Sequence, residues 1–417
     1  MKIIQYILLI LVPFYPIWAA LFYTLTHRHV DYLGVLVFLL LAFVLIIIQK
    51  IRIPKYLIFF ILFTIYHICS IFINGLIPAD ANLITFLLTD VNVFACIAFF
   101  VIENTDIEIS FLKKMNICLA IIVIVSLIVS IVQIKFPTFF VSPAIEKNVE
   151  WLLYIQQKRI FSIFSWTNLN SVGISFPIII AILLSVYNNK MNLFPWIVVS
   201  GIVVTFLTRA RYAMLGAVVA FSQLFFVSKI PLKRKISFLF IFAVGVILLI
   251  NIAKIAGFDV QQVVSDRILE QGSQLGSARA RLVSLEVFLI KFPEHPWFGV
   301  GPSTRADVVQ LLGGVAPLIH VGYLSYLYFY GILGFSFLLA AILFLLKDAW
   351  MAGTKNMFWG SFYGLLIFCL ANATMVFFNF SEFGILLLVL YLKYFKQKKS
   401  VESSTGYNFD SHNTELV

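Results

Sequence analysis

Two pairs of arginines have the charge and the spacing to hold phosphate groups. Arg209 and Arg211 join two long apolar runs, and Arg279 and Arg281 begin an amphipathic stretch that continues to residue 291. An arginine fork can donate to two phosphate oxygens at once, in a fixed geometry that lysine lacks. Arginines at a membrane boundary can also extend to the interface or contact lipid headgroups. The residues alone therefore leave two interpretations open, a diphosphate clamp and an interfacial anchor.

Two histidines and one carboxylate could take part in the same chemistry. His320 directly precedes an apolar run, where a neutral imidazole could accept a proton near pH 7 or simply cap the membrane boundary. We expect His295 to be a turn residue, because the prolines and glycines around it enforce a turn. Asp90 lies inside an apolar run, and a carboxylate at that depth must face protein or a water-filled cavity.

The sequence contains no motif of a metal or nucleotide site. A Gly-rich P-loop, an H-E-x-x-H helix, a Cys and His ligand spacing and an Asp-x-Asp pair are all missing. The four cysteines fall inside apolar runs, which favours a role as small hydrophobic residues over a disulfide or a thiolate site. We therefore expect neither a metal nor a cofactor.

The composition of the chain requires a membrane around these residues. Of the 417 residues, 62% are hydrophobic and 12% are charged, against roughly 25% charged in soluble domains. The apolar residues form runs of about twenty, the length that crosses about 30 Å of hydrocarbon. We predict an all-α polytopic membrane protein with about twelve transmembrane helices, near residues 4–24, 32–49, 56–74, 83–102, 115–134, 171–188, 193–208, 212–228, 236–253, 321–346, 357–377 and 380–395.

The distribution of basic residues predicts the orientation of these helices. The formal net charge is +11, but more than half of the 30 lysines and arginines, Lys393 among them, fall on one side if the N-terminus is cytoplasmic. This pattern favours a membrane topology with both termini inside over nucleic-acid binding. The predicted organisation is helices one to nine in 1–253 with an external loop at 135–170, a large external loop at 254–320, helices ten to twelve in 321–395, and a disordered cytoplasmic tail at 396–417.

Four elements, in their order along the chain, resemble motifs of the O-antigen ligase and polymerase superfamily. The first element precedes a predicted span and has Ser162 where glycine is usual. It runs from Arg159 to Gly173 and includes Phe164, Asn168 and Asn170. The second element is Thr208-x-Ala210-Arg211 at a helix junction, with alanine where serine is usual.

The third and fourth elements frame the end of the large loop. The third is Arg281 followed, fourteen residues later, by the sequence HPWFGVG at residues 295–301. The fourth is His320 followed by the sequence YGILG at residues 330–334, with Val321 where asparagine is usual. The resemblance covers about residues 155–346, and the HPWFGVG turn is its most specific part.

The resemblance implies a GT-C-type membrane glycosyltransferase of the bacterial cytoplasmic membrane. Its donor would be an undecaprenyl-diphosphate-linked oligosaccharide, and the transfer would be inverting and independent of metal. It implies that Arg211 and Arg281, helped by Arg209 and Arg279, stabilise the departing diphosphate, and that His320 takes the proton of the acceptor hydroxyl. Further substrate-site candidates are Arg159, Asn168, Asn170, His295 and Asp90. Expected partners are the lipid-linked glycan, membrane lipid and a chain-length regulator protein, with no nucleic acid.

Several functions fit this reading. A polymerase would extend a lipid-linked glycan in O-antigen, capsule or exopolysaccharide synthesis, and the HPWFGVG turn and the compact loop favour this branch. A ligase would instead transfer the glycan to lipid A core or another acceptor. A flippase or other transporter would be expected to show duplicated halves and broken helices at the midplane, and the sequence has no internal repeat. A purely structural membrane scaffold is the remaining alternative.

Overall fold

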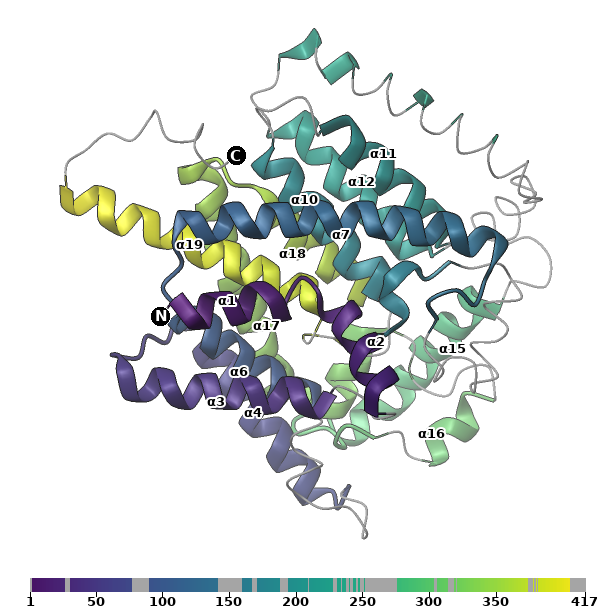
Figure 1. Cartoon of the computed structure of the whole chain (residues 1–417). Coiled ribbons are helices and arrows are strands. Elements are labelled where there is room, and N and C mark those ends of the chain that lie inside the picture. The colour runs from purple at the N-terminus through teal and green to yellow at the C-terminus, as the bar shows by residue number, and fades with distance from the viewer. Residues whose placement is uncertain are drawn as a thin grey trace.

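Every regular element in the described part of the chain is a helix (Figure 1). The computed structural model describes residues 2–26, 31–76, 90–141, 160–166, 171–187, 194–208, 210–227, parts of 231–251, 276–303, 306–313, 319, 321–373, 378, 380 and 382–405. The helices before residue 160 are α1 (Lys2–Leu11), α2 (Tyr15–Thr26), α3 (Asp31–Ile48), α4 (Lys55–Ile73), α6 (Val91–Asn104) and α7 (Ile109–Lys135). Those after it are η1 (Ser162–Trp166), α10 (Ser171–Val186), α11 (Phe194–Leu207), α12 (Arg211–Phe226), α15 (Gly276–Lys291), η4 (Phe292–Glu294), α16 (Ala306–Leu311), α17 (Gly322–Asn356), α18 (Gly360–Asn372) and α19 (Phe383–Thr405).

Among the described residues, three helices are long and apolar enough to cross a membrane by themselves. These are α4, α7 and α17, and the bent pair α1 and α2 forms a fourth candidate. Six further apolar helices have 10 to 17 residues. The described part of the chain is therefore all-helical, as expected from composition, and its long apolar helices are those of a membrane protein by length and composition.

The first expected span, 4–24, is broken in two. α1 and α2 meet at a bend of 78°. Pro13 and Pro16 lie at this bend, and proline has no N–H to donate to the carbonyl four residues earlier. The helical bonds from residue 13 to carbonyl 9 and from residue 16 to carbonyl 12 are therefore missing, which disfavours a single straight helix.

Other boundaries also differ from the expectation. α6, which replaces the expected span 83–102, begins at Val91. Asp90, expected inside that span, is therefore the N-cap of the helix. α17 continues ten residues past the expected end of its span, to Asn356. α19 extends to Thr405, past residue 396 where the tail was expected to begin, and residues 406–417 lie outside the described residues. Most of the expected span 236–253 lies outside the described residues.

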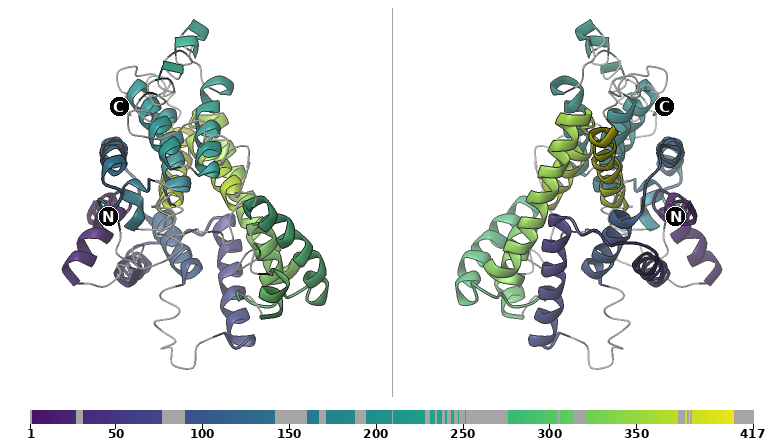
Figure 2. Two further views of the ribbon diagram at one scale, coloured as in Figure 1. Left: turned by 90° about the vertical axis from the view of Figure 1, so that its right-hand side faces the viewer. Right: turned by 90° about the vertical axis from the view of Figure 1, so that its left-hand side faces the viewer.

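Two helices, α10 and α19, form the buried centre of the described structure. α10 is buried continuously from Val172 to Leu184, and it contacts α11, α12, α18 and α19. Such burial on all sides requires apolar residues around the whole helix, as the sequence of α10 has. α4 and α17 form a second packed pair beside this centre, and Figure 2 shows them side by side. In Figure 1 the start of α1 and the end of α19 lie on the left, and α15 and α16 lie on the right.

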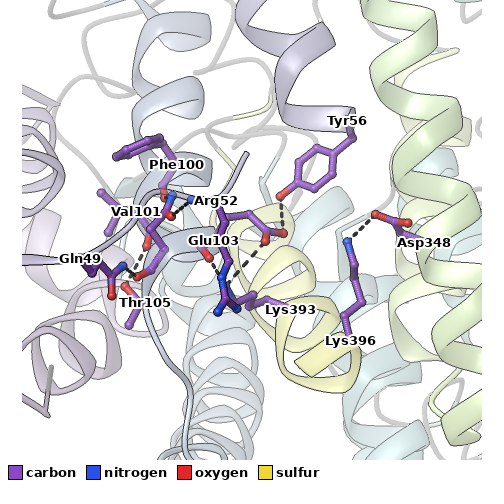
Figure 3. Close-up of polar contacts among 11 residues, drawn as sticks. Gln49, Arg52, Tyr56, Phe100, Val101, Glu103, Thr105, Asp348, Lys393 and Lys396 are labelled. Carbon is purple, nitrogen blue, oxygen red and sulfur yellow. Dashed lines mark hydrogen bonds and ion pairs between the residues drawn. The ribbon is translucent and has the colours of Figure 1, made fainter. Parts of the chain in front are cut away.

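A buried cluster of polar side chains joins the ends of α4, α6, α17 and α19 (Figure 3). The Tyr56 hydroxyl donates to Glu103 Oε1 over 2.8 Å, and Lys393 Nζ lies 3.9 Å from Glu103 Oε2. Lys393 also donates to the Glu103 carbonyl oxygen. Beside them Lys396 pairs with Asp348 at 2.7 Å. Lys393, expected as a lysine of the cytoplasmic surface, is therefore an interior cation that is held by a carboxylate.

Candidate functional site

The turn at residues 295–302 is inserted into a break in α17. Gly331 has φ 61° and ψ −172°, which interrupts the helix. In an unbroken helix, residue 332 would donate to carbonyl 328 and residue 333 to carbonyl 329. Instead the turn satisfies all four groups. Val300 N donates to Tyr328 O at 3.3 Å and Gly301 N to Phe329 O at 2.9 Å, while Ile332 N donates to Pro296 O at 2.8 Å and Leu333 N to Trp297 O at 3.1 Å.

Glycine is required on both sides of this contact. A Cβ added to Gly299 would lie 2.3 Å from the Phe329 carbonyl oxygen, and one added to Gly331 would lie 2.4 Å from the Trp297 carbonyl carbon and oxygen. Both glycines also have positive φ, a conformation that other residues adopt at a cost. The third and fourth sequence elements are thus two halves of one interlocked structure.

α4 holds the same structure from the side. The Tyr66 hydroxyl donates to the Phe298 carbonyl oxygen at 2.7 Å. Its ring packs on Gly334, where an added Cβ would lie 2.4 Å from the Tyr66 ring. The last glycine of the fourth element therefore leaves room for the side chain that fixes the turn.

Arg281 lies on α15, the helix that leads into this turn. α15 packs on α17 and α16 through a buried face of Ala280, Ser284, Val287 and Phe288. The Phe288 ring stacks on Phe292 of η4 at 4.9 Å between ring centroids. Leu282, Leu285 and Leu289 are exposed on the other side of this helix.

The guanidinium of Arg281 is only partly satisfied within the described part of the chain. Its Nε is buried and has no hydrogen-bond partner there. Arg279, two residues earlier, is exposed. A buried N–H of a cation without an acceptor is costly, so Arg281 is ready to receive an anionic oxygen.

Ion pairs join α15 to α16. Lys291 Nζ lies 2.6 Å from Asp307 Oδ2 and 3.0 Å from Glu294 Oε1. The hydrogen bond from Lys291 lowers the pKa of Asp307, and the bond to Asp307 raises the pKa of Lys291. The pair fixes the short α16 on the end of α15.

Arg211 begins α12, directly after the turn that follows α11. Thr208 shapes this turn, because its hydroxyl accepts from Ala210 N at 3.2 Å and donates to Thr205 O at 2.7 Å. Tyr212, next to Arg211, packs on Gly173 so closely that an added Cβ would lie 1.8 Å from the ring. The contact joins the first sequence element to the second.

Gln133 of α7 holds the segment that begins η1. Its Oε1 accepts from Phe161 N at 3.2 Å and from Ser162 N at 2.9 Å. Ser162 has φ 54°, which explains why glycine is usual at this position. Its hydroxyl donates to the Ser126 carbonyl oxygen at 2.8 Å and helps to hold this conformation. Ile160 N also donates to Leu207 O at 3.3 Å, so the segment is tied to the helix before Arg211.

Asp90 is held by contacts that the sequence did not reveal. Its Oδ1 accepts from Asn92 N and Val93 N at the start of α6, and its Oδ2 lies 2.7 Å from His67 Nε2. The other imidazole nitrogen of His67 lies 2.7 Å from the Tyr330 hydroxyl. Two ionisable residues inside predicted spans are expected to pair with one another, and this signal could have linked His67 to Asp90.

The structure describes some of the expected site residues and not others. His295 is exposed at the start of the turn, where its carbonyl oxygen accepts from Gly299 N, as expected for a turn residue. His295 begins the turn of the interlocked structure and Arg281 lies on the helix that leads into it, whereas Arg211 begins α12 after the junction that follows α11. The expected site residues outside the described residues are His320, Arg209, Arg159, Asn168 and Asn170.

Comparison with known proteins agrees with this arrangement. A family model described as O-antigen ligase matches residues 196–339, which include Arg211, α15, the turn and the break at Gly331. No curated protein matches the chain. Members of the matched family are glycosyltransferase-like membrane enzymes of O-antigen synthesis. Residues 196–339 are thus similar to the O-antigen ligase family, and this match supports the resemblance to the O-antigen ligase and polymerase superfamily.

Proposed function

We propose that this protein is a polysaccharide polymerase of the bacterial cytoplasmic membrane. It transfers a glycan from an undecaprenyl-diphosphate-linked donor to a hydroxyl of a lipid-linked acceptor glycan, at the outer face of the membrane. The proposal includes twelve spans in a GT-C-type arrangement with both termini cytoplasmic, so that α15, α16 and the turn lie outside. The observation that carries it is the buried Nε of Arg281, which has no acceptor among the described residues.

The chemistry follows from the charge that develops during transfer. The bond between the anomeric carbon and the diphosphate oxygen breaks, and its electron pair leaves with the diphosphate. Arginines held in place beforehand stabilise this charge without reorganising at the moment of reaction. Arg281 and Arg211 have this role in the proposal, and Arg209 and Arg279 support them.

The acceptor is activated by removal of a proton. Its hydroxyl oxygen attacks the anomeric carbon from the face opposite the leaving diphosphate, which inverts the configuration. His320 accepts the hydroxyl proton as the general base. Charge stabilisation by arginines and proton transfer by histidine together account for the transfer without a metal.

The test is turnover of an undecaprenyl-diphosphate-linked repeat unit by the purified full chain in detergent, with a chelator present. We expect longer lipid-linked glycans from the wild type and at least about a hundredfold loss in Arg281→Ala, the order of effect of removing one charge-stabilising donor. Arg281→Lys keeps the charge but lacks Nε, so it should not restore activity. Arg279→Ala, on the exposed side of α15, is the matched control and should retain more activity than Arg281→Ala. Full activity of Arg281→Ala would contradict the proposed role of this residue.

A ligase is the second candidate, because the matched family model is described as O-antigen ligase. A ligase would not extend the lipid-linked repeat but would transfer it to a lipid A core acceptor. Adding that acceptor to the same assay therefore separates the two enzymes. Transport of the lipid-linked glycan without any transfer would instead favour the flippase alternative.

A further inference from the structure

A hydrogen-bonded chain of two buried side chains and one partly buried carboxylate connects α4, α17 and α6. Asp90 caps α6, His67 lies on α4, and Tyr330 is the last residue of α17 before the break at Gly331. Both contacts of the imidazole are 2.7 Å long. His67 and Tyr330 are 3% and 2% exposed, so the bond between these two side chains is shielded from water.

The chain of bonds has a defined direction. Asp90 Oδ1 already accepts two backbone N–H groups, which favours the ionised carboxylate, and a carboxylate can only accept. His67 Nε2 therefore carries the proton and donates to Asp90 Oδ2. In the tautomer that this donation selects, Nδ1 is the acceptor for the Tyr330 hydroxyl. The carboxylate thus selects the imidazole tautomer that can hold Tyr330.

Tyr330 lies in the middle of the backbone that receives the turn. The two residues before it, 328 and 329, supply the carbonyl oxygens that accept from the turn, and 332 and 333 supply the N–H donors. Its neighbour on α4 in the same contact region is Tyr66, which donates to Phe298 O within the turn itself. Two consecutive residues of α4 therefore hydrogen-bond to this region: Tyr66 to the turn and His67 to Tyr330, beside the break in α17.

We propose that His67, oriented by Asp90, is a positioning residue for glycan transfer: it fixes Tyr330 and thereby the break in α17 on which the turn at 295–302 is docked. The inference rests on the proposed function for its effect on turnover. The turn follows α15, the helix that carries Arg281, and the docked segment of α17 follows His320 in the chain. Loss of the hydrogen bond to Tyr330 would therefore misplace groups on both sides of the reacting bond.

The experiment compares His67→Ala, His67→Gln and Tyr330→Phe, with Tyr326→Phe as the matched control. The glutamine side chain carries an NH2 group that can donate to Asp90 and a carbonyl oxygen that can accept from Tyr330, in place of the two imidazole nitrogens. Tyr326 is one turn earlier on α17 and equally buried, and its hydroxyl donates to Phe378 O and not to His67. The control therefore removes a buried hydroxyl from the same helix without touching His67.

Two readouts are measured on the full chain in detergent. Amide hydrogen exchange of peptides covering 296–302 and 331–334 reports whether the turn is docked. Turnover gives kcat and the KM for the lipid-linked donor. We expect His67→Ala and Tyr330→Phe to speed exchange of these peptides and to lower kcat by about ten- to a hundredfold with little change in KM, the order of loss expected for misplaced groups. His67→Gln should restore both, and Tyr326→Phe should alter neither.

The outcomes separate this inference from the proposed function. Unchanged exchange in His67→Ala and Tyr330→Phe would overturn the positioning role, whatever the activity. So would His67→Gln behaving like His67→Ala, because the donor and acceptor pattern would then be irrelevant. If the wild type transfers no glycan but exchange changes as expected, the docking role stands and the proposed function fails.

Discussion

Glu103 and Lys393 should be far more costly to replace one at a time than together. The two charges are 3.9 Å apart and each side chain is 6% exposed. At that distance they attract by about 4 kcal/mol if the effective dielectric constant is about 20. Lys393→Met leaves a buried carboxylate with Tyr56 as its donor, and Glu103→Gln leaves a buried ammonium with the carbonyl oxygen of residue 103.

The expected sizes follow from the cost of an uncompensated buried charge. Each single substitution should lower the free energy of unfolding by about 3 to 5 kcal/mol, with Glu103→Gln at the low end because the carbonyl acceptor remains. The double variant removes both charges and should lie within about 1 kcal/mol of the wild type. The coupling energy of the cycle should therefore be several kcal/mol, far above the values of independent sites.

The assay is denaturant unfolding of the four proteins in mixed micelles, with thermal midpoints as a second measure. Lys396→Met is the control, because Lys396 and Asp348 form a partly exposed pair with 32% and 18% exposure. Lys396→Met should lower the free energy of unfolding by about 1 kcal/mol or less. Additive losses in the double variant would refute the reasoning, because they would show that the two side chains contribute separately and not as a charge pair.

Three further predictions concern the turn at 295–302, η1 and α16. Gly331→Ala should undock the turn and abolish glycan transfer, whereas Gly313→Ala, with φ 59° but nothing within 4 Å of an added Cβ, isolates the cost of positive φ alone and should keep activity. Ser162→Gly should match the wild type in thermal stability, because relief of a positive φ offsets the lost hydroxyl bond, while Ser162→Ala keeps the strain and should lose about 1 kcal/mol. Lys291 lowers the pKa of Asp307. The stabilisation of α16 by this ion pair is therefore fully present above the ordinary pKa of aspartate and is lost as pH falls through the lowered pKa. Amide exchange of 306–311 should therefore speed up below that range, and Asp307→Asn should remove the pH dependence.

Local patterns in the sequence were sufficient for the class of fold and for much of the turn. Long apolar runs can form only helices in a membrane, because every backbone N–H and C=O must be satisfied within the segment. The proline and the two glycines of HPWFGVG limit the backbone to a turn, which follows the amphipathic stretch that forms α15. Boundaries were less accurate where a capping or breaking residue decided them, as at Pro13, Asp90 and Gly331.

The pairing of residues that are far apart in the chain was decided by the tertiary structure alone. Nothing in the sequence near Tyr330 specifies that its hydroxyl meets His67, or that the turn completes the hydrogen bonds that Gly331 breaks. Lys393 likewise has the sequence of a cytoplasmic surface lysine, but packing of α19 against α6 buries it beside Glu103. Composition and periodicity act within one helix, whereas a buried donor takes the acceptor that packing of distant helices brings within 3 Å, about the length of a hydrogen bond.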